Sequence, residues 1–367
     1  MFISVLKALG LVLGGLLFGL IVAEAGLRSF DYKLQLSHAW ILGSKIRVLN
    51  DDVIVIPQLF LDQGFYAAHR SQKSDLLVVA LGDSFTEGHP VERCADPRLP
   101  CPRDDSYPGV LERLLNDAGL DAAVVHAGIG DSGPDQQLRL FKDYILPRLS
   151  PQIVVWQFYT NDTWDNVKFP TYAISEENSL VPLDAHSNWY YRRLQLFNRI
   201  PLPSSVKKRS YAVNGLMQTF EDKRFSQVPT RYRNDPLAWA HDKIALEVKE
   251  MQRLARLYNF DVYFVLIAHQ ARYLTSMDPG WMWNDHWASY EEEYQHLLDL
   301  LESQPTFILA EFSAGEIQET TFLPVHSITD AIFAAATRDP MPRGNQHFNE
   351  AGNALLAQKV AQRILAP

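Results

Sequence analysis

Two residues that could act together in nucleophilic catalysis stand far apart in this chain of 367 residues. Ser84 lies in the motif GDSFTEG at 82–88, directly after an apolar segment. A free serine hydroxyl is a weak nucleophile, and it needs a base beside it to react. His347 precedes the last predicted helix in the motif NQHFN at 345–349, and it is a candidate for that base.

A glycine-rich motif, GIGDSG at 128–133, follows a second apolar segment and formally matches the GxGxxG pattern of dinucleotide-binding turns. Two observations disfavour that site. Pro134 follows the last glycine, and Ser150 and Pro151 stand about 20 residues further on, where a ribose-binding acid is expected. The motif is interpreted instead as a tight turn that brings backbone N–H groups, such as that of Gly130, to the end of a strand.

A third polar motif, YTND at 159–162, ends another apolar segment. The side chain of Asn161 can donate a hydrogen bond from its amide. The same residue also begins a glycosylation sequon, but a position at a strand end argues against glycosylation. An ordinary Asn/Asp turn is the remaining alternative.

Five apolar segments are typical of strands buried on both faces of a sheet. They span residues 76–81, 122–127, 153–159, 261–268 and 307–312. Helical segments alternate with them at residues 107–118, 135–149, 236–258, 289–301 and 349–365. This alternation predicts a parallel sheet with helices on both faces. Sites in such sheets form at the carboxyl ends of the strands, so we expect Ser84, Asn161 and His347 to meet there.

Taken in this order, the four motifs resemble those of the SGNH (GDSL-type) hydrolases, and most closely those of membrane-anchored bacterial members. The resemblance runs from about Leu76 to the C-terminus and is interrupted by residues 165–235. It includes HFNEAG at 347–352, which is similar to the family's ending. The resemblance implies a flavodoxin-like three-layer α/β/α sandwich with a five-stranded parallel sheet, and serine esterase or acyl-transfer chemistry.

The resemblance also implies roles for individual residues. Ser84 would be the nucleophile, and His347 would accept its proton and return it to the leaving group. The backbone N–H groups of Ser84 and Gly130, with the Asn161 amide, would form the oxyanion hole. Gly130 is preferred to Gly128 because the family's glycine usually precedes a polar residue, here Asp131.

The chain departs from the family at the acid of the triad. The family places an aspartate two or three residues before the histidine, where this chain has Asn345 and Gly344. An amide can orient an imidazole but does not stabilise its charged form. Three alternatives stay open: another acid such as Asp339 replaces it, a slow Ser–His dyad is sufficient, or the protein binds a ligand without catalysis. We expect an acid beside the His347 ring nitrogen that faces away from Ser84.

The N-terminus carries an uncharged apolar run from Ala8 to Ala23. A helix from Phe2 to Ala23 would be about 33 Å long, enough to cross a hydrocarbon core with Lys7 at the interface. Ala-Glu-Ala at 23–25 resembles a signal cleavage site, but the apolar run is long for a signal peptide. The length favours an uncleaved transmembrane anchor.

The predicted organisation has three parts. Residues 1–28 form the anchor or signal segment, and residues 29–74 form a juxtamembrane connector with a short strand at 53–56. Residues 75–367 form the hydrolase-like domain. Its insertion at about 165–235, rich in Pro, Asn, Ser and Tyr, is either a lid, a membrane-facing surface or a solvated loop.

Composition and charge argue against some classes of function. The formal net charge of −9 and the absence of a basic run argue against nucleic-acid binding. Cys94 and Cys101, the only two cysteines, lie in a Pro- and Asp-rich loop. They form either a disulfide, which would indicate an oxidising compartment, or two free thiols. Two cysteines and no HExxH motif disfavour a metal site, and no cofactor is expected.

The sequence therefore predicts a membrane-anchored, extracytoplasmic serine esterase or O-acyltransferase. Its expected substrate, a short acyl ester on a carbohydrate or cell-envelope polymer, follows from the resemblance and the predicted location alone. The alternative is a catalytically weak or inactive SGNH-like module that binds an envelope glycan or acyl ligand. The sequence does not predict the oligomeric state.

Overall fold

The computed structural model of the protein describes residues 74–87, 106–130, 132–168, 170–183, 228–267, 284–310, 348 and 350–366, with short pieces at 14–15, 18–19, 21–22, 46–49 and 52–55. Cys94 and Cys101 lie outside the described residues, so their pairing stays a prediction. The boundaries of the three predicted parts also stay a prediction.

The main sheet has five parallel strands in the order β4-β3-β5-β8-β9. The strands are β3 (Leu76–Gly82), β4 (Ala122–Gly128), β5 (Ile153–Phe158), β8 (Asp261–Ile267) and β9 (Phe307–Ala310). In chain order this is the 2-1-3-4-5 arrangement of flavodoxin-like folds. The predicted sheet is confirmed, and each strand lies within about two residues of its predicted bounds.

Successive side chains of each strand point to opposite faces of the sheet, and β3 shows how both faces are buried. Leu77, Val79 and Leu81 pack into one apolar core, while Val78 and Ala80 pack into another. A strand in that position needs an unbroken apolar sequence, which is why the segment reads LLVVAL.

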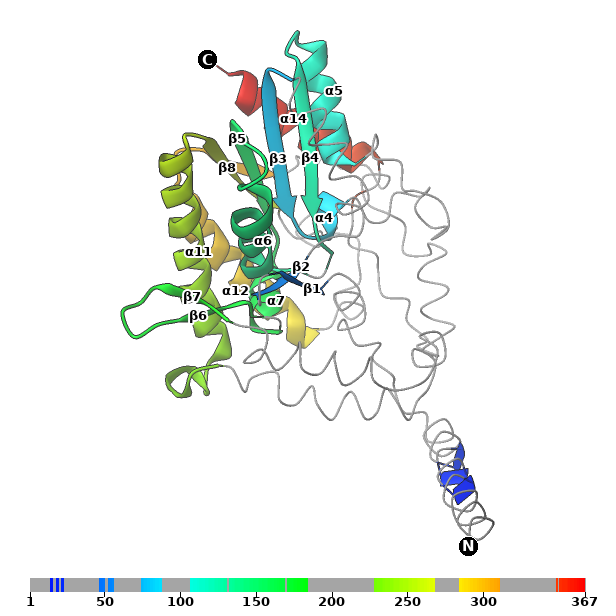
Figure 1. Ribbon diagram of the computed structural model, residues 1–367, viewed down its shortest axis with the longest axis vertical. Helices are drawn as coiled ribbons and strands as arrows, with labels where there is room; N and C mark the ends of the chain where they lie inside the picture. The colour runs from blue at the N-terminus through cyan, green and yellow to red at the C-terminus, as the bar shows by residue number, and fades with distance from the viewer. Residues whose placement is uncertain are drawn as a thin grey trace, which may run out of the picture.

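Helices cover each face, so the molecule has the predicted three layers (Figure 1). One face carries α6 (Pro134–Leu140), α11 (Pro236–Tyr258) and α12 (Asn284–Leu301). The other carries α5 (Tyr107–Asp117) and α14 (Glu350–Leu365). On α14, the predicted apolar stripe of Leu356, Val360 and Ile364 packs against the core.

Several elements differ from the prediction. The helix expected over 135–149 is α6 followed by a π-helical turn, η3 (Phe141–Ile145). The segment 165–235 contains the end of α7 (Asp162–Lys168), a hairpin of β6 (Tyr172–Ile174) and β7 (Leu180–Pro182), and the 3₁₀ turn η5 (Thr230–Tyr232). Residues 184–227 lie outside the described part.

Near the N-terminus, β1 (Ile46–Leu49) and β2 (Asp52–Val55) form an antiparallel pair, of which only the second strand was predicted. Within the described residues, no helix is both long enough and apolar enough to cross a membrane. Most of the predicted anchor, Ala8–Ala23, lies outside those residues.

Candidate active site

Ser84 lies at the carboxyl end of β3, the strand between β4 and β5. Strand β3 ends at Gly82, and the one-turn helix α4 (Ser84–Glu87) begins two residues later. The buried side chain of Asp83 links them, because its Oδ1 accepts a hydrogen bond of 2.9 Å from the Phe85 N–H. Its backbone carbonyl accepts another, of 2.9 Å, from the Glu87 N–H. This cap makes the chain turn at the strand end and leaves Ser84 half-buried.

The residues around this turn are tied to the neighbouring strand β5 through Gln157. Its Oε1 accepts hydrogen bonds from the Asp83 N–H (3.2 Å) and from the Thr86 hydroxyl (3.0 Å). A Cβ added at Gly82 would lie 2.1 Å from Thr86 Oγ1 and 2.4 Å from Gln157 Oε1. The absence of a side chain at Gly82 therefore allows the close approach of β3, α4 and β5.

The turn after β4 depends on its glycines in the same way. A Cβ at Gly128 would lie 2.1 Å from the backbone N of Glu87, and one at Gly133 would lie 2.7 Å from the backbone O of Asp162. Both glycines face the protein's own backbone. The GIGDSG motif is thus a tight turn at a strand end, as predicted.

Gly130, in this turn, lies beside α4 rather than open to a ligand. Its N–H donates a hydrogen bond of 2.7 Å to Glu87 Oε2. Sequence reasoning placed Gly130 among the oxyanion-hole donors and did not assign a role to Glu87. In this structure the donor already has a carboxylate partner.

Asn161 ends the segment after β5 and is half-buried. Its Nδ2 donates a hydrogen bond of 2.8 Å to Asp165 Oδ2 on α7. The next residue, Asp162, accepts a hydrogen bond of 2.8 Å from the Tyr159 N–H and is fully buried. Burial, together with the negative charge of nearby Asp83, raises the pKa of Asp162 well above its usual range.

The three strand ends meet at one edge of the sheet. Strand β3 pairs with β4 on one side and with β5 on the other, and Gly82 is level with Gly128. Ser84 and Gly130 therefore stand two residues beyond the same level. Asn161 follows the paired part of β5 on the opposite side of Ser84.

His347, Asn345 and Asp339 lie outside the described residues, so the base and the acid of the site stay predictions. Phe348, the residue after His347, is described and buried. Its ring packs edge-to-face on Phe85, the residue after Ser84, with ring centroids 4.9 Å apart. Two residues adjacent in sequence to the predicted base and nucleophile are thus in direct contact.

Sequence reasoning missed Gln157 and Glu87. Gln157 carried a signal, because it is the single amide in the apolar run IVVWQFY and a buried amide needs partners. Glu87 stands three residues after Ser84, a spacing that places both on one side of a helical turn. In the described residues, no group of three or more His, Cys, Asp or Glu side chains is arranged to hold a metal ion.

No family model and no curated protein matches the chain. Among solved structures, it is similar to the acetyl xylan esterase AlAXEase, with a TM-score of 0.39 and 13% identity, over 79% of this chain and 100% of the other. A carbohydrate acetylesterase family member from Sinorhizobium meliloti gives 0.36 and 10%, over 79% and 97%. TesA gives 0.38 and 13%, over 79% and 98%.

Proposed function

We propose that the protein is a serine esterase or acyltransferase with Ser84 as its nucleophile. One observation carries this proposal: Ser84 follows the strand β3, and the turns holding Gly130 and Asn161 follow its two neighbours, β4 and β5. The turn that holds Ser84 thereby lies between a turn that carries a backbone N–H and one that carries a side-chain amide. Such donors stabilise the oxyanion that forms when a hydroxyl attacks an ester carbonyl.

In the proposed reaction, His347 removes the proton of the Ser84 hydroxyl as its oxygen bonds to the carbonyl carbon. The tetrahedral intermediate then collapses, the ester C–O bond breaks, and His347 returns the proton to the departing alcohol. Water or a second hydroxyl next attacks the acyl carbon while His347 accepts its proton. The bond between the acyl carbon and the Ser84 oxygen then breaks, the acyl group leaves as an acid or a new ester, and His347 returns the proton to Ser84. The contact between Phe348 and Phe85 supports this assignment of the base.

The proposed substrate is a short acyl ester on a carbohydrate or cell-envelope polymer, outside the cytoplasm. This part of the proposal depends on the motif resemblance and on the apolar N-terminus. In the described pieces of that segment, Phe18, Ile21 and Val22 are helical and more than half exposed. Exposed apolar side chains on a helix are favourable in a membrane. Because such a helix would be held in the bilayer by apolar contacts, we expect detergent, but not high salt, to release the full chain from membranes.

The catalytic part is tested with a fluorophosphonate probe and p-nitrophenyl acetate, on the chain without residues 1–28. We expect the probe to label Ser84, and Ser84→Ala to abolish both labelling and turnover above background. Equal turnover by the variant would reject ester hydrolysis at Ser84. Ligand binding without any labelling would support the alternative, a non-catalytic module.

A further inference from the structure

Two carboxylates accept hydrogen bonds from the groups that the proposed function assigns to the oxyanion hole. Glu87 Oε2 lies 2.7 Å from the Gly130 N, and Asp165 Oδ2 lies 2.8 Å from the Asn161 Nδ2. These short distances are typical of hydrogen bonds to a charged acceptor. The two cases differ in one respect, because an amide NH₂ has a second hydrogen to donate and a backbone N–H has none.

The single hydrogen of Gly130 creates a conflict with catalysis. An oxyanion hole works because its donors point at the place where negative charge develops. In this structure the Gly130 N–H points at Glu87 Oε2. A substrate oxygen that uses this donor must therefore take the place of the glutamate oxygen.

The fold explains why Glu87 reaches this position. Glu87 is the last residue of α4, three residues after Ser84, and the two lie on one side of the helical turn. The absence of a Cβ at Gly128 lets the backbone of α4 lie directly against the end of β4. Glu87 is only half-buried, so its carboxylate can leave the turn for solvent without breaking the core.

We propose that Glu87 is a specificity-determining gate of the active site. Its carboxylate occupies the Gly130 donor in the free protein, and a substrate must displace it to be activated. This inference rests on the proposed function, since it assumes that Gly130 serves the oxyanion. The gate disfavours small esters that bind weakly, because they cannot offset the loss of a charge-assisted hydrogen bond.

The test compares Glu87→Gln and Glu87→Ala with the wild type on p-nitrophenyl acetate. Glutamine keeps an acceptor without the charge, and alanine removes it. Because charge-assisted hydrogen bonds are about twice as strong as neutral ones, we expect kcat/KM to rise about fivefold in Glu87→Gln and further in Glu87→Ala. The rate of Ser84 labelling by a fluorophosphonate should rise in the same order, because the phosphonyl oxygen uses the same hole.

The matched control is Glu112→Gln. Glu112, on α5, also accepts a backbone hydrogen bond, because its Oε2 lies 2.8 Å from the N of Val124. Val124 lies inside β4 and away from the carboxyl end of that strand. We expect this variant to leave kcat/KM and labelling unchanged.

Three other outcomes would decide against the gate. If Glu87 only holds the turn in place, Glu87→Gln will match the wild type and Glu87→Ala will be slower. If the Gly130 N–H does not donate to the oxyanion, neither variant will change the labelling rate, although Ser84 still reacts. If Ser84 reacts in neither the wild type nor Glu87→Ala, the proposed function fails together with the gate. Labelling that occurs only in Glu87→Ala would support both.

Discussion

Gln157 fixes the peptide that precedes Ser84, the proposed nucleophile. Its single carbonyl oxygen accepts from the Asp83 N–H and from the Thr86 hydroxyl, one on each side of Ser84. The side chain is fully buried, so water cannot replace the acceptor that the Asp83 N–H loses with it, whereas the Thr86 hydroxyl also lies 3.4 Å from the Leu81 carbonyl and 3.3 Å from the Tyr107 hydroxyl. Removing the acceptor of a buried donor costs about 1–3 kcal/mol. At the scale of single residues, Gln157 takes no part in the proposed reaction but fixes the position of the Ser84 hydroxyl.

We expect Gln157→Leu to lower the free energy of unfolding by about 1–3 kcal/mol and to reduce kcat by more than it changes KM. The reason is that Ser84 would lose its fixed position while the substrate-binding surface stays in place. The measurements are urea unfolding and steady-state kinetics on p-nitrophenyl acetate.

Gln152→Leu is the control for this prediction. Gln152 Oε1 accepts from the Leu77 N–H (2.7 Å) at the amino end of the same strand, β3. It should reduce stability but not kcat. Equal losses of kcat in both variants would mean that Gln157 acts through stability alone.

At the scale of elements, an aromatic cluster joins three segments that carry the site. Phe85 on α4 contacts Phe348 (ring centroids 4.9 Å apart) and Tyr159 after β5 (4.7 Å apart). The Asn353 side chain on α14 accepts from the Tyr107 N–H (3.1 Å) at the start of α5 and donates to the Phe348 carbonyl (3.4 Å). Parts of the chain that are distant in sequence are therefore held against α4, the helix of the proposed nucleophile.

We expect Phe348→Leu to slow the fluorophosphonate labelling of Ser84 at least tenfold, while costing about 1 kcal/mol of stability. The packing between Phe348 and Phe85 positions the chain next to His347, and a small shift of a base has large effects on rate. Labelling kinetics and thermal unfolding are measured together.

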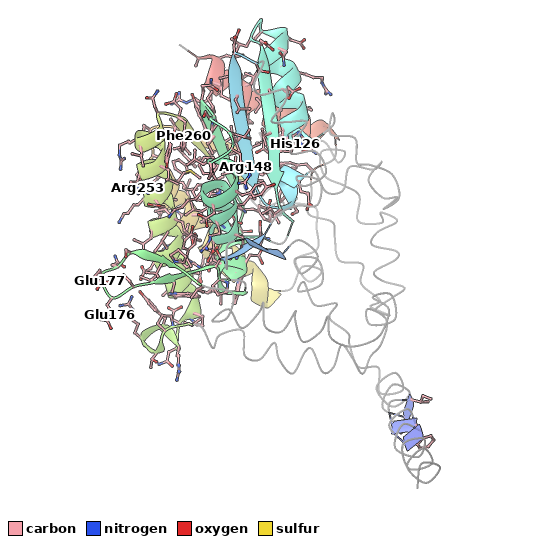
Figure 2. All side chains as sticks on the ribbon, in the orientation of Figure 1. His126, Arg148, Glu176, Glu177, Arg253 and Phe260 are labelled. Carbon is pink, nitrogen blue, oxygen red and sulfur yellow. The ribbon has the colours of Figure 1, made fainter. Side chains whose placement is uncertain are left out.

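Phe260→Leu provides the comparison, because Phe260 makes a similar edge-to-face contact with Phe141 (centroids 5.5 Å apart). Phe260, labelled in Figure 2, precedes β8 and so lies toward the opposite end of the sheet from Ser84. Phe260→Leu should lose a similar amount of stability and leave the rate of Ser84 labelling unchanged. A tenfold loss of labelling there too would contradict a specific role for Phe348.

At the scale of the whole molecule, a buried polar network connects the layer of α6, α7 and α11. Lys243 forms an ion pair with Asp135, and both side chains are fully buried. Asn166 on α7 donates to Glu247 Oε2 on α11 (2.9 Å). Burial raises the pKa of Glu247 to about 8, although the nearby Lys243 opposes this shift. The network holds α6, α7 and α11 in one arrangement. Its cost is that the buried Glu247 carboxyl group ionises less readily in the folded protein.

The pKa of Glu247 predicts a pH dependence of stability. The group has a pKa of about 4.5 when unfolded and about 8 when folded, so between these values the folded state binds more protons. The free energy of unfolding should therefore fall as the pH rises from about 4.5 to 8, and then level off. In Glu247→Gln this contribution is absent. The Tm of Glu247→Gln minus the Tm of the wild type should therefore increase by at least about 2 °C from pH 5 to pH 8.5.

Glu250→Gln, on the same helix, is the matched control. Although partial burial opposes the shift, hydrogen bonds from Arg253 and Lys142 lower the pKa of Glu250. Its contribution to stability is lost as the pH falls below about 4.5, outside the range tested. This variant should follow the wild type from pH 5 to pH 8.5. A Glu247→Gln variant that does the same would show that Glu247 is ionised in the folded protein.

The sequence by itself determined the sheet and the ends of its strands, because strands buried on both faces must be apolar along their whole length. The five apolar segments from LLVVAL to FILAEF therefore marked β3, β4, β5, β8 and β9, and the polar motifs after β3, β4 and β5 marked the candidate site. The helix α7 and the hairpin β6–β7 escaped prediction, since short elements with mixed polarity carry weak periodic signals.

Only the tertiary structure decided which hydrogen bonds the site residues make. The motif around Gly130 predicted a turn with a free N–H, but the partner of that N–H is Glu87, 43 residues earlier in the chain. Gln157, on the other side, holds the peptide before Ser84 from the neighbouring strand. Such pairings depend on strand register and on how closely two backbones approach. Those quantities are set by packing between distant segments, and no local pattern records them.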